Sequence, residues 1–261
     1  MKFLKLCPLT VILFFARAAF AQNANTVEND LLKSFKKISY WDDEQRKGTA
    51  GADDSLIKAN STFEKKLKTY TQQYPATINE PFASLKNERL DIFTSADGLF
   101  RIYSWDTWLG GTMHDFANML QYKIGQKTQS ILWTSTEGNY IPLFNNLYTF
   151  KNGGKTYYLG IYGRIYSSKD AGRGIQIFAI ENGKLNEDVK LIKTQSGMRS
   201  KINYTYDFFS VVDIAFEKRP TITFDAVTKT ISIPLVALNG KVTSKFITYK
   251  FNGQYFEKVK S

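Results

Sequence analysis

The stretch LDIFTSADGLFRIYSW, which runs from Leu90 to Trp105, decides the fold of this 261-residue chain. Apolar and polar residues alternate along much of it, and a period of two is typical of a β-strand. Asp97-Gly98 interrupts the alternation, and an Asp-Gly pair accepts the positive φ of a tight turn. The stretch therefore predicts a β-hairpin with strands at Leu90 to Ser95 and Leu99 to Trp105.

Similar short runs continue to the C-terminus and alternate with glycine-containing turns, of which Asn252-Gly253 is the strongest hairpin signal. Further strands are expected at Met113 to Lys123, Gln129 to Ser135, Tyr140 to Phe150, Thr156 to Ile165, Ile175 to Ile180, Ile202 to Phe209, Val211 to Phe216, Thr221 to Asp225, Thr230 to Leu235, Phe246 to Phe251 and Tyr255 to Val259. Such spacing predicts a mainly β fold of antiparallel sheets over residues 81–261, as a sandwich, a barrel or a small propeller-like arrangement.

Two segments before residue 81 have the period of an α-helix. Their apolar stripes consist of Val27, Leu31, Leu32, Phe35 and Ile38 in the first, and of Leu56, Phe63, Leu67, Tyr70 and Tyr74 in the second. Asn25 is the expected cap of the first helix, and Asp54 or Ser55 that of the second, which Pro75 ends. The polar stretch from Asp42 to Asp54 is expected to be a loop. We therefore expect two N-terminal helices within residues 22–80, paired with each other or packed on the β domain.

The first 21 residues have the organisation of a secretory signal peptide. Lys2 and Lys5 supply the positive charge, Leu9 to Phe15 is apolar, and Ala19-Phe20-Ala21 fits a cleavage site. The apolar run is too short to span a bilayer, and no later segment is long and apolar enough to be a transmembrane helix.

Cleavage after Ala21 would leave residues 22–261 without a cysteine, because Cys7 is the only one. An exported eukaryotic protein of this size usually carries disulfides. The sequence therefore predicts a cysteine-free, soluble, exported bacterial protein, in the periplasm or at the extracellular or cell surface.

The charge of the chain is basic, with a formal net charge of +11 that falls to +8 when the three cations of the signal are removed. Lysines outnumber arginines 27 to 8, and they are scattered along the chain. Specific phosphate recognition favours the bidentate fork of arginine. We therefore interpret the lysines as a solvated surface and expect no specific nucleic-acid binding.

The segment DGLFRIYSWDTWLGGTMHDF, Asp97 to Phe116, holds two of the four tryptophans, the only histidine and a Gly-Gly pair. Its Tyr-Ser-Trp-Asp-x-x-x-Gly-Gly-Thr core resembles that of an uncharacterised family of secreted proteins from Bacteroidetes-type bacteria. The resemblance covers a small part of the chain. It implies export and a β-rich domain, and it carries no known activity and no catalytic residue.

The candidate ligand-binding residues of this segment are Tyr103, Trp105, Asp106, Trp108, His114 and Asp115. The aromatic rings could stack on a sugar, while the aspartates and the histidine bond its hydroxyl groups. The alternative is that the aromatic residues pack in the core and that Asp106 shapes a turn. The sequence leaves both interpretations open.

Chemistry that depends on several histidines is excluded by the composition, and no thiol would remain once Cys7 is removed with the signal. A zinc site normally uses histidine and cysteine ligands, so we expect no metal site, and no motif indicates a cofactor. Catalytic residues are not identifiable from the sequence. We favour a non-enzymatic binding or structural module of the periplasm or cell surface, with a glycan or an envelope component as partner. The alternative is a carbohydrate-active hydrolase that uses paired carboxylates.

Overall fold

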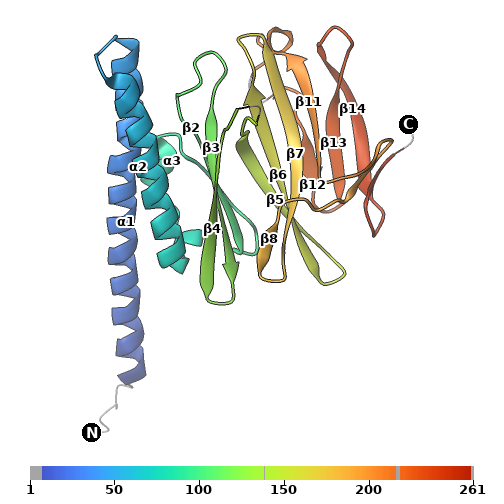
Figure 1. The fold of residues 1–261 in the computed structure, drawn as a ribbon. Coiled ribbons are helices and arrows are strands. Elements are labelled where there is room, and N and C mark those ends of the chain that lie inside the picture. Colours follow the sequence, from blue (N-terminus) through green and yellow to red (C-terminus); the bar gives the residue numbers. More distant parts are fainter. Residues whose placement is uncertain (1–7, 138, 216–217, 260–261) are drawn as a thin grey trace.

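Two helices and three β-sheets are stacked as layers in the computed structural model (Figure 1). The structure describes residues 8–137, 139–215 and 218–259, with side chains from Asn25 onward. In order, the layers are the helices, a four-stranded sheet, a five-stranded sheet and a six-stranded sheet, here called the helical layer and the first, second and third sheets. The predicted mainly β fold of antiparallel sheets with two N-terminal helices is confirmed, and none of the sheets closes into a barrel.

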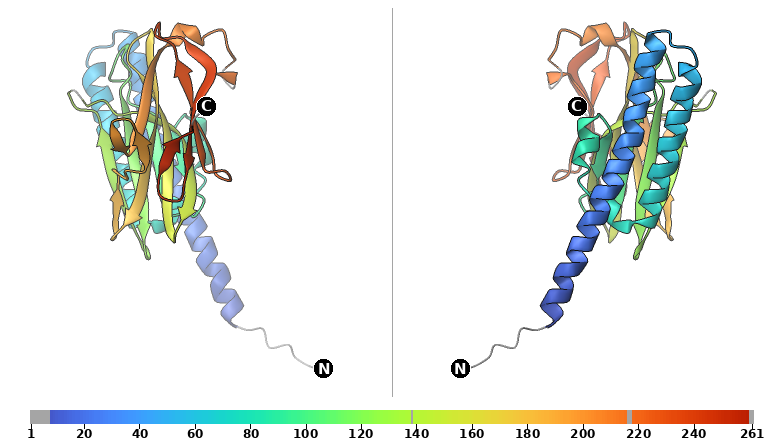
Figure 2. Two further views of the ribbon diagram at one scale, coloured as in Figure 1. Left: turned by 90° about the vertical axis from the view of Figure 1, so that its right-hand side faces the viewer. Right: turned by 90° about the vertical axis from the view of Figure 1, so that its left-hand side faces the viewer.

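The helical layer contains α1 (Pro8–Arg46) and α2 (Ala52–Gln73), which lie side by side in Figure 2, followed by the short η1 (Pro75–Ile78) and α3 (Ala83–Asn87). α1 and α2 are helical because their apolar side chains recur at spacings of three and four, which places them on one face of each helix. The members of the predicted stripes that are buried are Val27, Leu31, Phe35, Ile38, Leu56, Phe63 and Leu67.

The turn between α1 and α2 is shorter than the sequence predicts. α1 continues to Arg46, whose Nε donates to both carboxylate oxygens of Asp42 at 3.2 and 3.1 Å. α2 begins at Ala52, directly after Gly51, whose φ of 75° suits a glycine. The expected loop from Asp42 to Asp54 is therefore wrong at both ends, because the two helices extend into it.

The predicted helix caps are also wrong. Asn25 lies inside α1, which begins at Pro8, and Asp54 and Ser55 lie inside α2. The predicted cleavage site after Ala21 falls within the length of α1. Residues 1–7, which include the two lysines of the predicted signal, lie outside the described residues.

The first sheet has the strand order β1-β2-β3-β4, and every neighbouring pair is antiparallel. Its strands are β1 (Asp91–Thr94), β2 (Phe100–Asp106), β3 (Phe116–Ile124) and β4 (Lys127–Thr134). The predicted hairpin is present, and Gly98 in its turn has a φ of 67°. β3 begins three residues later than predicted, because residues 107–115 form the loop between β2 and β3.

The second sheet has the order β11-β7-β6-β5, with the short β8 paired to β7. Its strands are β5 (Leu143–Asn152), β6 (Lys155–Ile165), β7 (Asp170–Glu181), β8 (Lys184–Asn186) and β11 (Lys201–Asp207). A register shift between Phe144 and Asn146 places a β-bulge in the edge strand β5. Bulges redirect nearby side chains, and this one lies beside the groove described below.

The third sheet has the order β10-β9-β15-β14-β13-β12 and is antiparallel except for the pair of β9 with β15. Its strands are β9 (Ile192–Thr194), β10 (Gly197–Arg199), β12 (Thr223–Asp225), β13 (Thr230–Val236), β14 (Val242–Phe251) and β15 (Phe256–Lys258). The predicted strand from Val211 to Phe216 is wrong. After the short helix η2 (Phe208–Ser210), the described residues 211–215 form turns stabilised by local backbone hydrogen bonds.

Apolar cores fill the spaces between the layers. Phe63 and Trp105 lie between the helical layer and the first sheet, Phe100 and Phe178 between the first and second sheets, and Ile175 among the residues between the second and third sheets. Because successive residues of a strand point to opposite faces, β2 contributes to two cores, and six of its seven residues are buried. Within the described part of the chain, no helix is long and apolar enough to cross a membrane.

Candidate functional site

The loop of residues 107–115 is held closed by its own polar groups. The backbone nitrogen and the hydroxyl of Thr107 both donate to the carbonyl oxygen of Asp115, each at 2.9 Å. The Trp108 amide donates to Asp106 Oδ1 at 2.9 Å. A side chain at Gly110 would place its Cβ 2.0 Å from the carbonyl oxygen of Met113, so this position requires glycine. The loop therefore has a defined shape.

Tyr103 and Trp105 lie in the core between β2 and the helices, and both are fully buried. The Tyr103 hydroxyl donates to Gln121 Oε1 at 3.1 Å, and the Trp105 ring meets the Phe63 ring edge-on with centroids 5.2 Å apart. Neither ring has a free face for a sugar. The packing interpretation fits these two residues, and the stacking interpretation does not.

Trp108 lies on the helical side of the loop and is partly buried against the same core. The guanidinium carbon of Arg46, near the end of α1, is 5.4 Å from the centroid of its ring. The backbone of Trp108 has a φ of 59°, which is rare for a residue with a large side chain. The side chain thus connects the loop to α1.

His114 is paired with Asp106 across the loop. Its Nδ1 atom is hydrogen-bonded to Asp106 Oδ2, and its ring stacks on Phe116 with centroids 6.0 Å apart. Burial raises the pKa of Asp106, and the hydrogen bonds from His114 and the Trp108 amide oppose this rise only in part. The pair therefore fixes the orientation of the imidazole.

Asp115 faces α2. Its Oδ2 accepts a hydrogen bond from the Thr107 hydroxyl at 3.2 Å, and its Oδ1 is buried without a partner among the described residues. Burial and the negative charge of Asp115 raise the pKa of Glu64 on α2. Within the described ranges, no group of three His, Cys, Asp or Glu side chains is placed to hold a metal ion.

A groove of about 920 Å³ lies beside this loop, and His114 is the only one of the six predicted residues that lines it. One edge strand of each sheet lines it, namely β1, β5 and β12. Residues of β6, β7 and β11 complete its wall, together with Arg219, Thr221 and Ile222. We call this feature the edge groove. The sequence analysis did not find it, because its strands are distant along the chain.

The walls of the edge groove combine apolar surface with a few polar groups. Its aromatic residues are Phe93, Phe116, Tyr148, Tyr206 and Phe208. Among the described residues, Asp91 is its only carboxylate, and burial raises the pKa of that group. Its other charged residues are Arg164, Arg173 and Arg219. Glycines adjacent in the sequence to two of these arginines, Gly163-Arg164 and Gly172-Arg173, were the signal that sequence reasoning missed.

Space for these groups comes from glycines in the second sheet. The Cβ of a side chain at Gly163 would have its three nearest neighbours at 3.8 Å (Gly172 O), 3.9 Å (Asn145 Nδ2) and 4.0 Å (Arg173 Nη1). Asn145 reaches this point because it is the bulged residue of β5. Two nitrogen donors therefore border an open space above Gly163.

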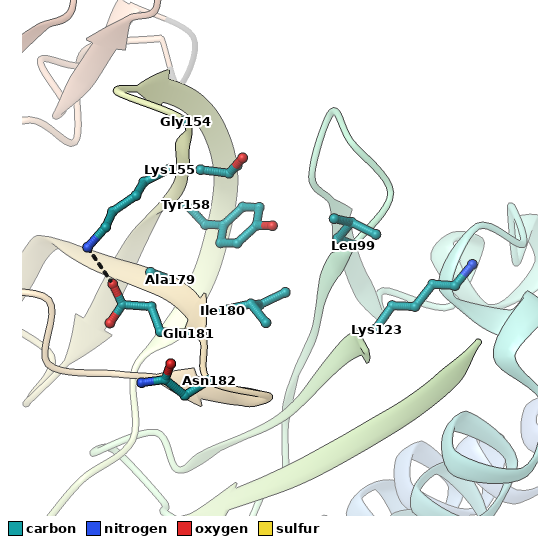
Figure 3. Close-up of a pocket in the computed structure, with 10 residues that line it drawn as sticks. Leu99, Lys123, Gly154, Lys155, Tyr158, Ala179, Ile180, Glu181 and Asn182 are labelled. Atoms are coloured by element: carbon teal, nitrogen blue, oxygen red, sulfur yellow. Dashed lines mark hydrogen bonds and ion pairs between the residues drawn. The ribbon is translucent and has the colours of Figure 1, made fainter. Parts of the chain in front are cut away.

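A second, smaller pocket of about 550 Å³ lies at the hairpin turns of the first and second sheets (Figure 3). Tyr158 lines it, and its hydroxyl donates to Asp97 Oδ2 at 3.0 Å. Burial and the charge of Asp97 raise the pKa of Tyr158. Lys155 and Glu181 at its rim form an ion pair of 3.5 Å. Because Tyr158, Lys155 and Glu181 already have partners within the protein, this pocket is the weaker candidate.

Comparison with known proteins adds no family to this description. No protein-family model matches the chain, and no curated protein matches it. The fold and the edge groove are therefore the basis for any functional conclusion. They define a layered β protein with a helical layer on one side and one large groove at the edges of its sheets.

Proposed function

We propose that the chain is an exported, non-enzymatic binding module that holds a glycan or another envelope component in the edge groove. The observation that carries this proposal is the lining of the groove. Its volume of about 920 Å³ is within the usual range of small-molecule sites. Aromatic side chains form much of its wall, and a few amides, hydroxyls and guanidinium groups supply directional contacts. This combination suits the apolar faces and the polar edges of a sugar ring.

Hydrolysis of a glycan is less well supported by the same lining. A glycosidase places two carboxyl groups on either side of the bond that it cleaves. Of the described residues that line the edge groove, Asp91 alone carries a carboxylate. Asp106, whose Oδ2 is bonded to His114, and Asp115, which repels Glu64, are not among the lining residues. The acidic residues near the loop therefore support its structure more readily than a reaction in the groove.

Export is supported by the N-terminal sequence. Two lysines, an apolar run and a small-x-small site occur in the order that signal peptidase substrates have. The described side chains begin at Asn25, so cleavage after Ala21 removes none of the described core.

Glycan binding by residues 22–261 tests the proposal. We would screen a glycan array of bacterial surface polysaccharides and measure the affinity of each hit by calorimetry. Gly163→Leu should abolish binding, because the new side chain would project into open space in the groove. Ser244→Leu, which introduces the same side chain at an exposed position outside the groove, should have no effect. Binding that survives Gly163→Leu would contradict the proposal, and release of new reducing ends from a bound glycan would favour the hydrolase.

A further inference from the structure

We propose that the ligand of the edge groove carries a carboxylate or phosphate group, and that Arg173 and the Asn145 amide bind this oxyanion above Gly163. The proposal rests on the proposed function and names the chemical class of its ligand. Of the two sources of an oxyanion, an acidic sugar agrees best with the aromatic wall of the groove.

The strand register first explains why the guanidinium group has room. Arg173 on β7 lies opposite Gly163 on β6, and Arg164 lies opposite Gly172. Directly opposed residues of antiparallel strands project from the same face. Each arginine therefore has a glycine as its neighbour across the strands, and Gly163 leaves space where another side chain would compete with a ligand.

The donors around this space are not used by the protein. The side chain of Arg173 forms no hydrogen bond or ion pair with the part of the chain that the structure describes. Arg173 Nη1 and Asn145 Nδ2 lie 4.0 and 3.9 Å from the point that a Cβ on Gly163 would occupy. A guanidinium group in a partly enclosed site gains most from a charged acceptor, which can receive two of its N–H groups at once.

Two further observations show that the polar groups here are incompletely paired. The hydroxyl of Tyr204, which lies opposite Arg173 on β11, is buried without a hydrogen-bond partner among the described residues. Arg164 projects from the other face of the second sheet and lines the same groove, and its Nε atom is also buried without a partner in the described chain. Unsatisfied buried polar groups need an explanation, and an anion bound with its water on the Arg173 face supplies one for the Tyr204 hydroxyl.

The excess of positive charge in the groove also favours an anionic ligand. Among the described residues that line it, three are arginines and one, Asp91, carries a carboxylate. A concave surface with this excess has a positive potential that attracts and orients anions. The scattered surface lysines would attract anions as well. The experiment must therefore separate the contribution of the groove to the affinity from that of the overall basic charge of the chain.

Calorimetry with three probes provides this separation: trigalacturonate, the neutral trigalactose of the same linkage, and inorganic phosphate. We expect trigalacturonate to bind and trigalactose not to bind. Arg173→Gln should weaken binding about 10-fold or more, because a charge-assisted hydrogen bond is lost. Gly163→Val should weaken it similarly by filling the space, without a packing conflict at Cβ. Arg199→Gln removes the same charge from an exposed strand outside the groove and should change the affinity less than about 2-fold.

The outcomes distinguish this inference from the proposed function. Binding of phosphate in place of trigalacturonate, with the same response to the variants, would support the oxyanion site and identify phosphate as its source. A different result is that trigalactose binds, that Gly163→Val abolishes this binding and that Arg173→Gln leaves it unchanged. This result would overturn the proposed oxyanion site and would still support the binding module. Equal losses of affinity in Arg173→Gln and Arg199→Gln would also overturn the oxyanion site, because they would show that the net charge of the protein attracts the ligand. Thermal melts of each variant establish that it is folded.

Discussion

Asn60 Nδ2 on α2 donates a hydrogen bond of 2.9 Å to the carbonyl oxygen of Thr107, the first residue of the loop between β2 and β3. Asn60 is buried, and its Nδ2 also donates to the carbonyl oxygen of Leu56 at 3.1 Å. This side chain thus connects the helical layer to the loop that carries His114. The position of the loop depends on α2 as well as on the strands that flank it.

Asn60→Ala should therefore destabilise the protein by about 1–3 kcal/mol, because the buried carbonyl of Thr107 loses its donor. Urea denaturation measures the change. Thr62→Ala, on the exposed side of α2, is the matched control and should cost less than about 0.5 kcal/mol. Equal effects of the two variants would show that the bond to the loop contributes nothing.

Arg101 is a buried cation whose guanidinium group is bonded to oxygen atoms of other segments. Its Nε donates to Thr94 Oγ1 at 2.7 Å, its Nη2 to the carbonyl of Glu80 at 2.5 Å, and its Nη1 to the carbonyl of Thr77. Arg101→Ala should cost about 3–5 kcal/mol, through the cavity and the unpaired carbonyls. Chemical denaturation should show less than about 0.5 kcal/mol for Arg199→Ala, which is exposed. A small loss of stability in Arg101→Ala would mean that water replaces the guanidinium group as the donor to these oxygen atoms.

Trp108→Ala tests the role of a tryptophan that the sequence analysis named as a candidate ligand-binding residue. Trp108 packs partly against the helix-facing core, so its truncation should cost about 1–3 kcal/mol. Ligand affinity should not change, because Trp108 does not line the edge groove. The neighbouring Leu109→Ala is the control, since Leu109 is exposed and should matter little. Lost affinity with unchanged stability would restore Trp108 to the binding site.

The stability of the protein should depend on the protonation of Asp91. Burial raises the pKa of this carboxyl group, so the folded state binds its proton more tightly than the unfolded state does. Its charge therefore opposes folding at neutral pH, and this cost disappears as the pH falls through the raised pKa. Asp91→Asn should be more stable than the parent at pH 7, and the difference should shrink below the raised pKa. Urea melts across this range check the sign, which a constant difference would contradict.

Processing of the N-terminus is the last prediction. Mass spectrometry of the protein from its native envelope should find a chain that begins at Gln22. Purified residues 22–261 should melt at the same temperature with and without reductant, because the only cysteine is Cys7. Recovery of the chain with residues 1–21 intact would contradict the signal-peptide interpretation.

The sequence by itself determined the local structure. The period-two runs and the Asp97-Gly98 turn fixed the β1–β2 hairpin, and the stripes that contain Leu31 and Phe63 fixed the helical faces. These features depend on residues close together in the chain, so a local pattern suffices to predict them. The pattern failed at residues 211–215, where apolar residues alternate but the backbone turns beside η2.

Tertiary structure alone decided which surfaces are free. Tyr103 and Trp105 are in the core because the helices cover that face of β2, and no local pattern specifies what covers a strand. The edge groove likewise exists only because β1, β5 and β12 become the outer strands of three stacked sheets. Asn145 and Arg173, 28 positions apart in the sequence, border the same space through a bulge and a strand register. Such contacts depend on long-range pairing, which is settled by burying apolar area across the whole chain.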